Sequence, residues 1–277
     1  MNPLIDAAAL AAQLADERLV IVDCRHDLGN PEAGEAAWRA AHIPGALFMH
    51  LDRDLSAPKS GRNGRHPLPS PDAFASLLGR FGITPAHRVV AYDDAGGMFA
   101  ARLWWMLRRA GHRDVSVLDG GLAAWRATGA ALDDSVRALP PSTYPVTATA
   151  VLADADEVLA NIDSQRLLLV DARAPDRFRG ENETLDPVGG HIPGALNRFF
   201  KLNLGDDGRF KPADVLHAEW RALIGARDPQ SLVMQCGSGV TACHNLLALE
   251  LAGLSGARLY PGSWSEWCSD ADRPVAR

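Results

Sequence analysis

Short apolar runs alternate with longer segments of helical periodicity along the whole chain. The runs have no polar residue at every second position, which is typical of strands buried on both faces of a sheet. They fall at residues 19–23, 88–92, 115–118, 167–171, 232–235 and 257–260. Helical stretches such as 100–110 and 242–252 lie between them. The pattern predicts an α/β fold with a mostly parallel central sheet flanked by helices.

The pattern occurs twice, because the second half of the chain repeats motifs of the first. The sequence His-Ile-Pro-Gly-Ala at residues 42–46 recurs unchanged at residues 191–195, and Trp125 is matched by Trp267. Repetition in register predicts two tandem domains of one fold.

A proline-rich segment, Leu-Pro-Pro-Ser-Thr-Tyr-Pro at residues 139–145, separates the two copies. Proline favours extended backbone and breaks helices, so we expect the domain boundary at residues 136–148. The N-terminal domain would then span residues 1–138 and the C-terminal domain residues 149–277.

Composition is that of a soluble globular protein, with 47% hydrophobic and 22% charged residues in a chain of 277. The net charge of −6 and the scattered basic residues predict no nucleic-acid partner and no anionic membrane surface. The first residues lack the basic and apolar regions of a signal peptide, and no apolar stretch reaches membrane-spanning length. We therefore expect a cytoplasmic protein.

Cys236 stands between the apolar run 232–235 and a helical segment, so we expect it at the point where a buried strand turns into a helix. Gly237 and Gly239 allow the backbone to turn tightly and to point N–H groups inward. A thiol at a helix start is expected to have a lowered pKa and to react as a thiolate. From the local sequence alone, the alternative is a buried structural cysteine in a glycine turn.

The other cysteines suggest less. No Cys-x-x-Cys pair is present, so neither a structural zinc site nor a disulfide framework is expected. Cys243 follows Cys236 by two helical turns on roughly the same face, and it fits either a resolving thiol or a core residue. Cys24 and Cys268 indicate no role.

The first copy has no cysteine at the corresponding place. Carrying the spacing of Trp125 and Trp267 over to Cys236 leads to Asp94, in the run Tyr-Asp-Asp-Ala-Gly-Gly. A carboxylate cannot act as a sulfur nucleophile. We therefore expect a catalytically inactive N-terminal domain and a catalytic C-terminal domain.

These motifs, in this order, resemble the rhodanese superfamily and, within it, the two-domain sulfurtransferases. The resemblance covers nearly the whole chain. It includes both His-Ile-Pro-Gly-Ala motifs, the Asp-Gly-Gly at 119–121 with its downstream tryptophan, the run Gly-Ser-Trp-Ser-Glu-Trp at 262–267, and the Cys236 loop. It implies two rhodanese-like domains in which a small-molecule donor gives its sulfane sulfur to Cys236 as a persulfide. The acceptor is cyanide, a thiol or thioredoxin, and no metal or organic cofactor is implied.

The loop at residues 236–241, Cys-Gly-Ser-Gly-Val-Thr, is similar to that of 3-mercaptopyruvate sulfurtransferases. Thiosulfate sulfurtransferases more often carry basic or bulky residues after the cysteine. The resemblance implies that backbone N–H groups of the loop, at Gly237, Gly239, Val240 and Thr241, bind the anionic sulfur.

The same resemblance implies a proton relay. Ser238 matches the serine of the loop, His66 the histidine from the first half of the chain, and Asp52 the aspartate. A histidine can pass protons near neutral pH, and a carboxylate can hold its tautomer. Without the resemblance, His66 and Asp52 are read as a loop histidine and a surface charge.

Arginines are expected to bind the carboxylate of the donor. Arg177 matches the first family arginine, and its guanidinium suits a planar carboxylate. The mercaptopyruvate enzymes carry a second arginine where this chain has Asp186, as the thiosulfate enzymes do, so thiosulfate stays open as the donor. Arg179 is the candidate replacement, and it is equally well explained as a surface arginine.

Two other functions use a cysteine loop of this kind. Tyrosine phosphatases share a cysteine loop between strand and helix, but they need an arginine six residues after the cysteine, where this chain has Ala242. Without that charge nothing neutralises a phosphoryl group, so a phosphatase is not expected. A persulfide carrier that serves a partner protein would use the same loop, and this alternative stays open.

Overall fold

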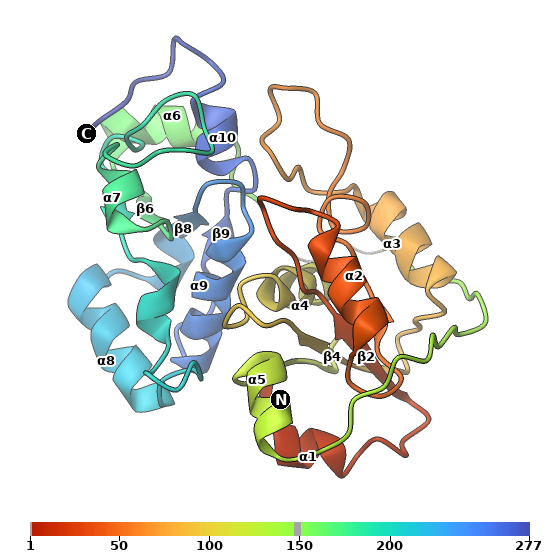
Figure 1. Ribbon diagram of the computed structural model, residues 1–277. Helices are drawn as coiled ribbons and strands as arrows, with labels where there is room; N and C mark the ends of the chain where they lie inside the picture. The colour runs from red at the N-terminus through yellow and green to blue at the C-terminus, as the bar shows by residue number, and fades with distance from the viewer. Residues whose placement is uncertain (1, 147–150) are drawn as a thin grey trace. The chain divides into compact units, whose positions relative to one another are not determined.

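The computed structural model describes residues 2–146 and 151–277, and the chain divides into two compact units (Figure 1). Unit 1 comprises Met1–Ala57, Pro69–Thr149 and Asp206–Arg209, and unit 2 comprises Pro58–Leu68, Ala150–Gly205 and Phe210–Arg277. The last two residues of the predicted linker, and the predicted domain start at residue 149, lie outside the described residues.

Unit 1 is built on a parallel five-stranded sheet with the strand order β1-β5-β4-β2-β3. The strands are β1 (Leu4–Ile5), β2 (Leu19–Asp23), β3 (Leu47–Phe48), β4 (Arg88–Tyr92) and β5 (Val115–Leu118). The helices are α1 (Ala7–Ala11), α2 (Ala33–Ala40), α3 (Pro71–Arg80), α4 (Ala100–Arg109) and α5 (Gly121–Ala127).

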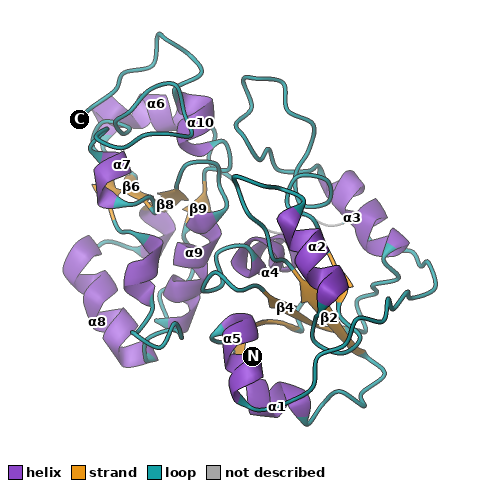
Figure 2. Ribbon diagram, viewed as in Figure 1, coloured by secondary structure: helices purple, strands orange, loops and turns teal. Residues whose placement is uncertain are grey.

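Helices cover both faces of this sheet (Figure 2). On one face, Leu10 of α1 and Trp125 of α5 share a core cluster with Ile21 and Val90 of the central strands. Every residue of β2 is buried, which confirms the expectation from its uninterrupted apolar run.

Unit 2 repeats the architecture with a parallel four-stranded sheet in the order β7-β6-β8-β9. The strands are β6 (Leu168–Asp171), β7 (Leu196–Asn197), β8 (Leu232–Gln235) and β9 (Arg258–Leu259). The helices are α6 (Ala155–Ser164), α7 (Pro175–Phe178), α8 (Ala213–Ile224), α9 (Thr241–Leu251) and α10 (Ser263–Trp267), with 3-10 turns at Phe200–Asn203 and Pro229–Ser231.

Helices α6 and α10 lie on one side of the unit 2 sheet, and α8 and α9 lie on the other (Figure 1). Leu169 and Val233 of the sheet pack against Trp264 and Trp267 of α10. The prediction of two α/β domains with parallel sheets is therefore confirmed. Within the described ranges, every helix is too short or too polar to cross a lipid bilayer.

One buried ion pair recurs in both units and explains part of the sequence repeat. Arg25 binds Asp23 at the end of β2, and Arg173 binds Asp171 at the end of β6, each with an N–O distance of 2.7 Å. Each arginine also donates to the carbonyl that immediately precedes the His-Ile-Pro-Gly-Ala motif, at 2.8 and 2.7 Å. The pair thus connects the strand end to the motif, and each buried charge is hydrogen-bonded to its partner.

The segment Pro58–Leu68 belongs by its contacts to unit 2, although it comes from the first half of the chain. Gly64 has φ +83°, and a Cβ there would lie 2.9 Å from the carbonyl oxygen of Gly262. The N–H of Arg65 donates to the Ser265 hydroxyl at 3.0 Å. A division at residues 136–148 alone therefore does not describe unit 2.

The strand register identifies Asp93, rather than Asp94, as the counterpart of Cys236. Strand β4 ends on Tyr92 and β8 on Gln235, and each of these residues pairs with the aspartate that ends the neighbouring strand. The next residue is Asp93 in unit 1 and Cys236 in unit 2. The expectation of Asp94 was wrong by one residue, because the chain between this position and the later tryptophan differs in length between the copies.

Asp93 fills the strand-to-helix loop of unit 1 with a carboxylate. One of its oxygens accepts from the N–H groups of Ala95 and Gly97, and the other from those of Phe99 and Ala100, at 2.8–2.9 Å. The side chain is fully buried. Burial raises the pKa of the Asp93 carboxyl, and the four N–H donors act in the opposite direction.

We predict that Asp93→Asn destabilises the protein, because the NH₂ group of the new amide would face N–H donors in a buried loop. Each donor left without an acceptor costs about 1–3 kcal/mol. Urea unfolding measures the change in the free energy of unfolding. Asp94→Asn, one residue on and exposed, is the matched control and should change it by less than about 0.5 kcal/mol. Similar losses for the two variants would contradict this assignment.

Candidate active site

Cys236 lies at the turn between β8 and α9, as predicted, and only 2% of it is exposed. The N–H groups of Ser238 and Gly239 donate to its sulfur at 3.4 and 3.1 Å. Converging N–H groups at a helix start favour an anion. The loop therefore holds the sulfur as the corresponding loop of unit 1 holds the carboxylate of Asp93.

The two glycines of the loop are required for different reasons. Gly239 has φ +76°, and a Cβ there would lie 2.4 Å from the carbonyl oxygen of Pro261. A Cβ on Gly237 would lie 2.8 Å from Nη2 of Arg65. Only glycine fits either position without a shift of its neighbours.

Val240 directly precedes α9 and Thr241 begins it, so their N–H groups belong to the open first turn of the helix. Their contact with a bound sulfur stays a prediction. Cys243, further along α9, is fully buried and donates from Sγ to the carbonyl of Gly239 at 3.3 Å. These contacts favour a core role for Cys243.

Ser263 holds the backbone of the cysteine in place. The N–H of Cys236 donates to the Ser263 hydroxyl at 3.1 Å, and this hydroxyl donates to the carbonyl of Tyr260 at 2.9 Å. Ser263 has φ +55°, a conformation that costs a non-glycine residue about 1–2 kcal/mol, and unit 1 has Gly121 with φ +56° at the matching helix start. Sequence reasoning did not single out Ser263, because its glycine counterpart gave no signal of a side-chain role.

His66 and Ser238 are brought together, as predicted. Nδ1 of His66 lies 2.7 Å from the Ser238 hydroxyl, and both residues are buried in unit 2. Asp52 belongs to unit 1, where its Oδ2 lies 3.8 Å from Nε2 of His26. The part of Asp52 in a relay stays a prediction.

The predicted arginines differ in their surroundings. Arg177, on α7, extends its guanidinium to Glu183 and lies beside Gly237, whose Cβ would be 3.5 Å from Nη2. Arg179 forms an ion pair with Glu181 at 2.8 Å, and its side chain is 53% exposed. Arg179 therefore matches the surface arginine of the alternative interpretation, and its contact with a donor stays a prediction.

Two buried carboxylates hold the arginines near the cysteine. Glu183 binds Arg177 and lies 3.4 Å from Arg173, while Asp186 binds Arg65 and lies 3.5 Å from Arg177. Burial raises the pKa of Asp186 above its usual value. Burial acts in the same direction on Glu183, but the hydrogen bonds and charge of Arg177 together with the backbone N–H groups of Leu185 and Asp186 outweigh it and leave the pKa lowered.

Comparison with known proteins identifies the family of the chain. The rhodanese-like domain family matches the chain twice, at residues 6–128 and 154–270. The chain belongs to the rhodanese family.

Its relatives include both kinds of two-domain rhodanese. A protein of Pseudomonas aeruginosa named "Probable 3-mercaptopyruvate sulfurtransferase" is 51% identical over 99% of this chain and 97% of the relative. The thiosulfate sulfurtransferase of Bos taurus is 38% identical over 82% of this chain and 77% of the relative. The crystal structure of SseA from Escherichia coli, a 3-mercaptopyruvate sulfotransferase, superposes with a TM-score of 0.81 at 32% identity, covering 95% of this chain and 99% of SseA.

Among the cysteines of this rhodanese chain, Cys24 and Cys268 are poorly suited to reaction. Burial, reinforced by the charge of Asp23, raises the pKa of Cys24 well above its usual value. Burial, with a smaller contribution from Asp186, raises the pKa of Cys268 to about 11. Both therefore stay protonated at neutral pH.

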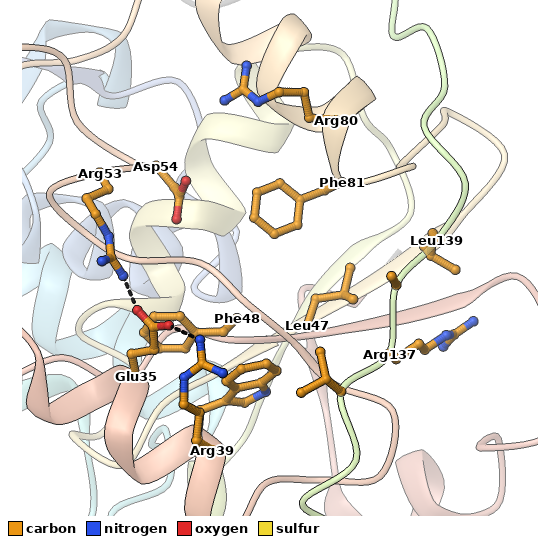
Figure 3. Close-up of a pocket in the computed structure, with 13 residues that line it drawn as sticks. Glu35, Arg39, Leu47, Phe48, Arg53, Asp54, Arg80, Phe81, Arg137 and Leu139 are labelled. Carbon is orange, nitrogen blue, oxygen red and sulfur yellow. Dashed lines mark hydrogen bonds and ion pairs between the residues drawn. The ribbon is translucent and has the colours of Figure 1, made fainter.

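A cavity of about 450 Å³ lies in unit 1 and is lined by apolar and basic side chains (Figure 3). Glu35 pairs with Arg39 and Arg53 on one side, beside the ring of Phe48. Its described lining residues include none of the residues predicted for the rhodanese site.

Among the described residues, one cluster has the composition of a metal site. His26, His50 and Asp52 offer ligand atoms within 4.8 Å of one another. Nδ1 of His50 accepts from the N–H of Asp52 at 3.0 Å, and its Nε2 bonds to the carbonyl of Pro31 at 3.1 Å. Both ring nitrogens of His50 are therefore in use, and the cluster supports no metal proposal.

We predict that Ser263→Ala destabilises the protein more than Ser263→Gly. Both variants lose the two hydrogen bonds of the hydroxyl, which costs about 1–3 kcal/mol, but glycine also relieves the left-handed strain. Urea unfolding of the two variants measures the difference. An alanine variant as stable as the glycine variant would contradict the presence of strain at Ser263.

Proposed function

We propose that this protein takes a sulfur atom from 3-mercaptopyruvate onto Cys236 and passes it to a thiophilic acceptor. The observation that carries the proposal is the buried Cys236 sulfur, which accepts from two loop N–H groups next to a hydroxyl hydrogen-bonded to His66. The loop sequence and the 51% identity with the Pseudomonas aeruginosa protein support 3-mercaptopyruvate as the donor.

In the first half-reaction, the Cys236 thiolate attacks the donor sulfur. The bond between that sulfur and C3 of the donor breaks, and its electron pair goes to C3. Cys236 then carries a persulfide, while C3 takes up the proton of the donor thiol and becomes the methyl group of pyruvate. The carbon is reduced as the sulfur is oxidised, so no external redox partner enters.

In the second half-reaction, cyanide or a thiolate attacks the outer sulfur of the persulfide, and Cys236 leaves as a thiolate. The products are thiocyanate or a new persulfide. Neither half-reaction requires a metal or an organic cofactor.

We assign the proton to the relay of Ser238, His66 and Asp52. The donor thiol loses one proton and C3 gains one. The Ser238 hydroxyl and His66, 2.7 Å apart, are proposed to carry this proton from the thiol to C3. Asp52 is assigned to hold the tautomer of His66.

The remaining loop residues and the arginines bind the donor in this proposal. The N–H groups of the loop from Gly237 to Thr241 stabilise the anionic persulfide. Arg177 binds the donor carboxylate through its planar guanidinium. Arg179, which forms a surface ion pair, is the weaker candidate for this task.

We assign catalysis to unit 2 alone. In unit 1, the carboxylate of Asp93 already accepts the loop N–H groups that would otherwise face a reacting sulfur. The N-terminal domain is therefore proposed to be inactive.

The proposed partners are a small sulfur donor and a small acceptor, with thioredoxin as a candidate protein thiol. The basic residues are scattered, so neither a nucleic acid nor a membrane is proposed. All four cysteines are free, which suits a reducing compartment such as the cytoplasm.

Thiosulfate is the second candidate donor. Asp186 occupies the position of the second family arginine, and the bovine thiosulfate sulfurtransferase is 38% identical to this chain. The two donors require different help, since thiosulfate releases sulfite without the protonation of a carbon atom.

We expect kcat/KM to be much higher with 3-mercaptopyruvate than with thiosulfate, with cyanide as the acceptor and thiocyanate as the measured product. Cys236→Ala should abolish both activities, while Cys268→Ala, the matched control, should keep most of them. His66→Ala should lower kcat/KM about 10²- to 10⁴-fold with 3-mercaptopyruvate and far less with thiosulfate, because only the former needs the proton. A preference for thiosulfate would support the second candidate, and equal losses in His66→Ala would overturn the relay.

A further inference from the structure

Two guanidinium groups from distant parts of the sequence flank the cysteine loop of unit 2. A Cβ on Gly237 would lie 2.8 Å from Nη2 of Arg65 and 3.5 Å from Nη2 of Arg177. Arg65 comes from the segment Pro58–Leu68, and Arg177 comes from α7. Both groups therefore lie next to the residue that follows Cys236.

These arginines remain partly open, while the carboxylates that hold them are buried. The side chains of Arg65 and Arg177 are 25% and 20% exposed, whereas those of Asp186 and Glu183 are 2% and 3% exposed. Partly exposed arginines that are held by buried carboxylates are suited to a charged ligand, because little side-chain freedom is lost on binding.

Asp186 connects the two arginines. Its Oδ1 accepts from Nη1 of Arg65, and its Oδ2 lies 3.5 Å from Nη2 of Arg177. Glu183 accepts from Nε and Nη2 of Arg177 at 3.1 and 2.7 Å. Each guanidinium is thus oriented by a buried carboxylate. Asp186 bonds to Nη1 of Arg65, whereas Nη2 of Arg65 is the atom nearest Gly237.

This arrangement indicates that Asp186 orients Arg65, a role that its position in the sequence did not predict. In the mercaptopyruvate enzymes the second arginine is expected at position 186. Here that position holds an acid, but the acid is bonded to an arginine from another segment. The positive charge is present beside the loop, although it comes from residue 65.

We propose that Arg65 is the second guanidinium of the donor site and that Asp186 is its positioning residue. Arg65 and Arg177 together bind the carboxylate and adjacent ketone oxygen of a short 2-oxo acid that carries sulfur on C3. Two planar guanidinium groups beside Gly237 match the two planar oxygen-bearing groups of such a donor. This inference rests on the proposed function and names how its donor is recognised.

The first test compares Arg65→Gln with Arg62→Gln, a matched control on the same segment with an exposed side chain. Loss of a charged hydrogen bond to the donor should raise KM for 3-mercaptopyruvate about 10- to 100-fold. The inhibition constant of pyruvate, which has the same carboxylate and ketone, should rise in parallel. Arg62→Gln should change neither value.

Two further measurements separate donor binding from a structural effect. Transfer of sulfur from the preformed persulfide to cyanide involves no donor carboxylate, so Arg65→Gln should slow this step much less than it slows turnover of 3-mercaptopyruvate. The charge exchange Arg65→Asp with Asp186→Arg rebuilds the pair with the arginine at position 186, and it should lower KM again relative to Arg65→Asp alone.

Unchanged KM and unchanged pyruvate inhibition in Arg65→Gln, with an active wild type, would overturn this inference and leave the proposed function standing. A slowed persulfide-to-cyanide step equal to the loss with 3-mercaptopyruvate would also overturn it, since the defect would then be structural. A wild-type enzyme that does not turn over 3-mercaptopyruvate would overturn the proposed function and, with it, this inference.

Discussion

In both units, backbone N–H groups converge at the turn that follows a strand, and they favour a negatively charged group there. The two units place different side chains at this turn. In unit 1 the carboxylate of Asp93 accepts hydrogen bonds from four of these N–H groups. In unit 2 the sulfur of Cys236 takes the equivalent place. The same loop surrounds a carboxyl group in one unit and a thiol in the other, because the residue after the strand is Asp93 in unit 1 and Cys236 in unit 2.

The site also depends on the segment Pro58–Leu68, which joins unit 2 from the first half of the chain. It brings His66 to Ser238 and Arg65 to Asp186. Gly64 makes this possible, since its left-handed backbone passes close to the carbonyl of Gly262. The second half of the sequence alone therefore lacks the histidine and one of the two guanidinium groups that lie beside the cysteine loop.

The sequence predicted those features of the fold that depend on local residue patterns, namely the buried strands and the turn at Cys236. All six apolar runs form strands, and Cys236 lies at the expected turn, because buried strands and helix starts have local signatures. The two-residue edge strands β1, β3 and β7 were missed, whereas β9, of the same length, was found within the apolar run 257–260. The counterpart of Cys236 was predicted one residue too late, at Asp94 instead of Asp93. The prediction used sequence spacing, which does not give the strand register when the intervening loops differ in length. Arg65 and Ser263 were missed because their roles arise from contacts between residues far apart in sequence.

We propose that sulfur is carried by the loop of unit 2 and by no residue of unit 1. The most direct measurement is peptide mass spectrometry of the protein after one equivalent of 3-mercaptopyruvate without an acceptor, combined with the amount of pyruvate released. We expect one added sulfur atom per released pyruvate, located on the peptide that contains Cys236 and lost when cyanide is added. Added sulfur on the peptide that contains Cys24, or pyruvate release without any persulfide at Cys236, would contradict the account.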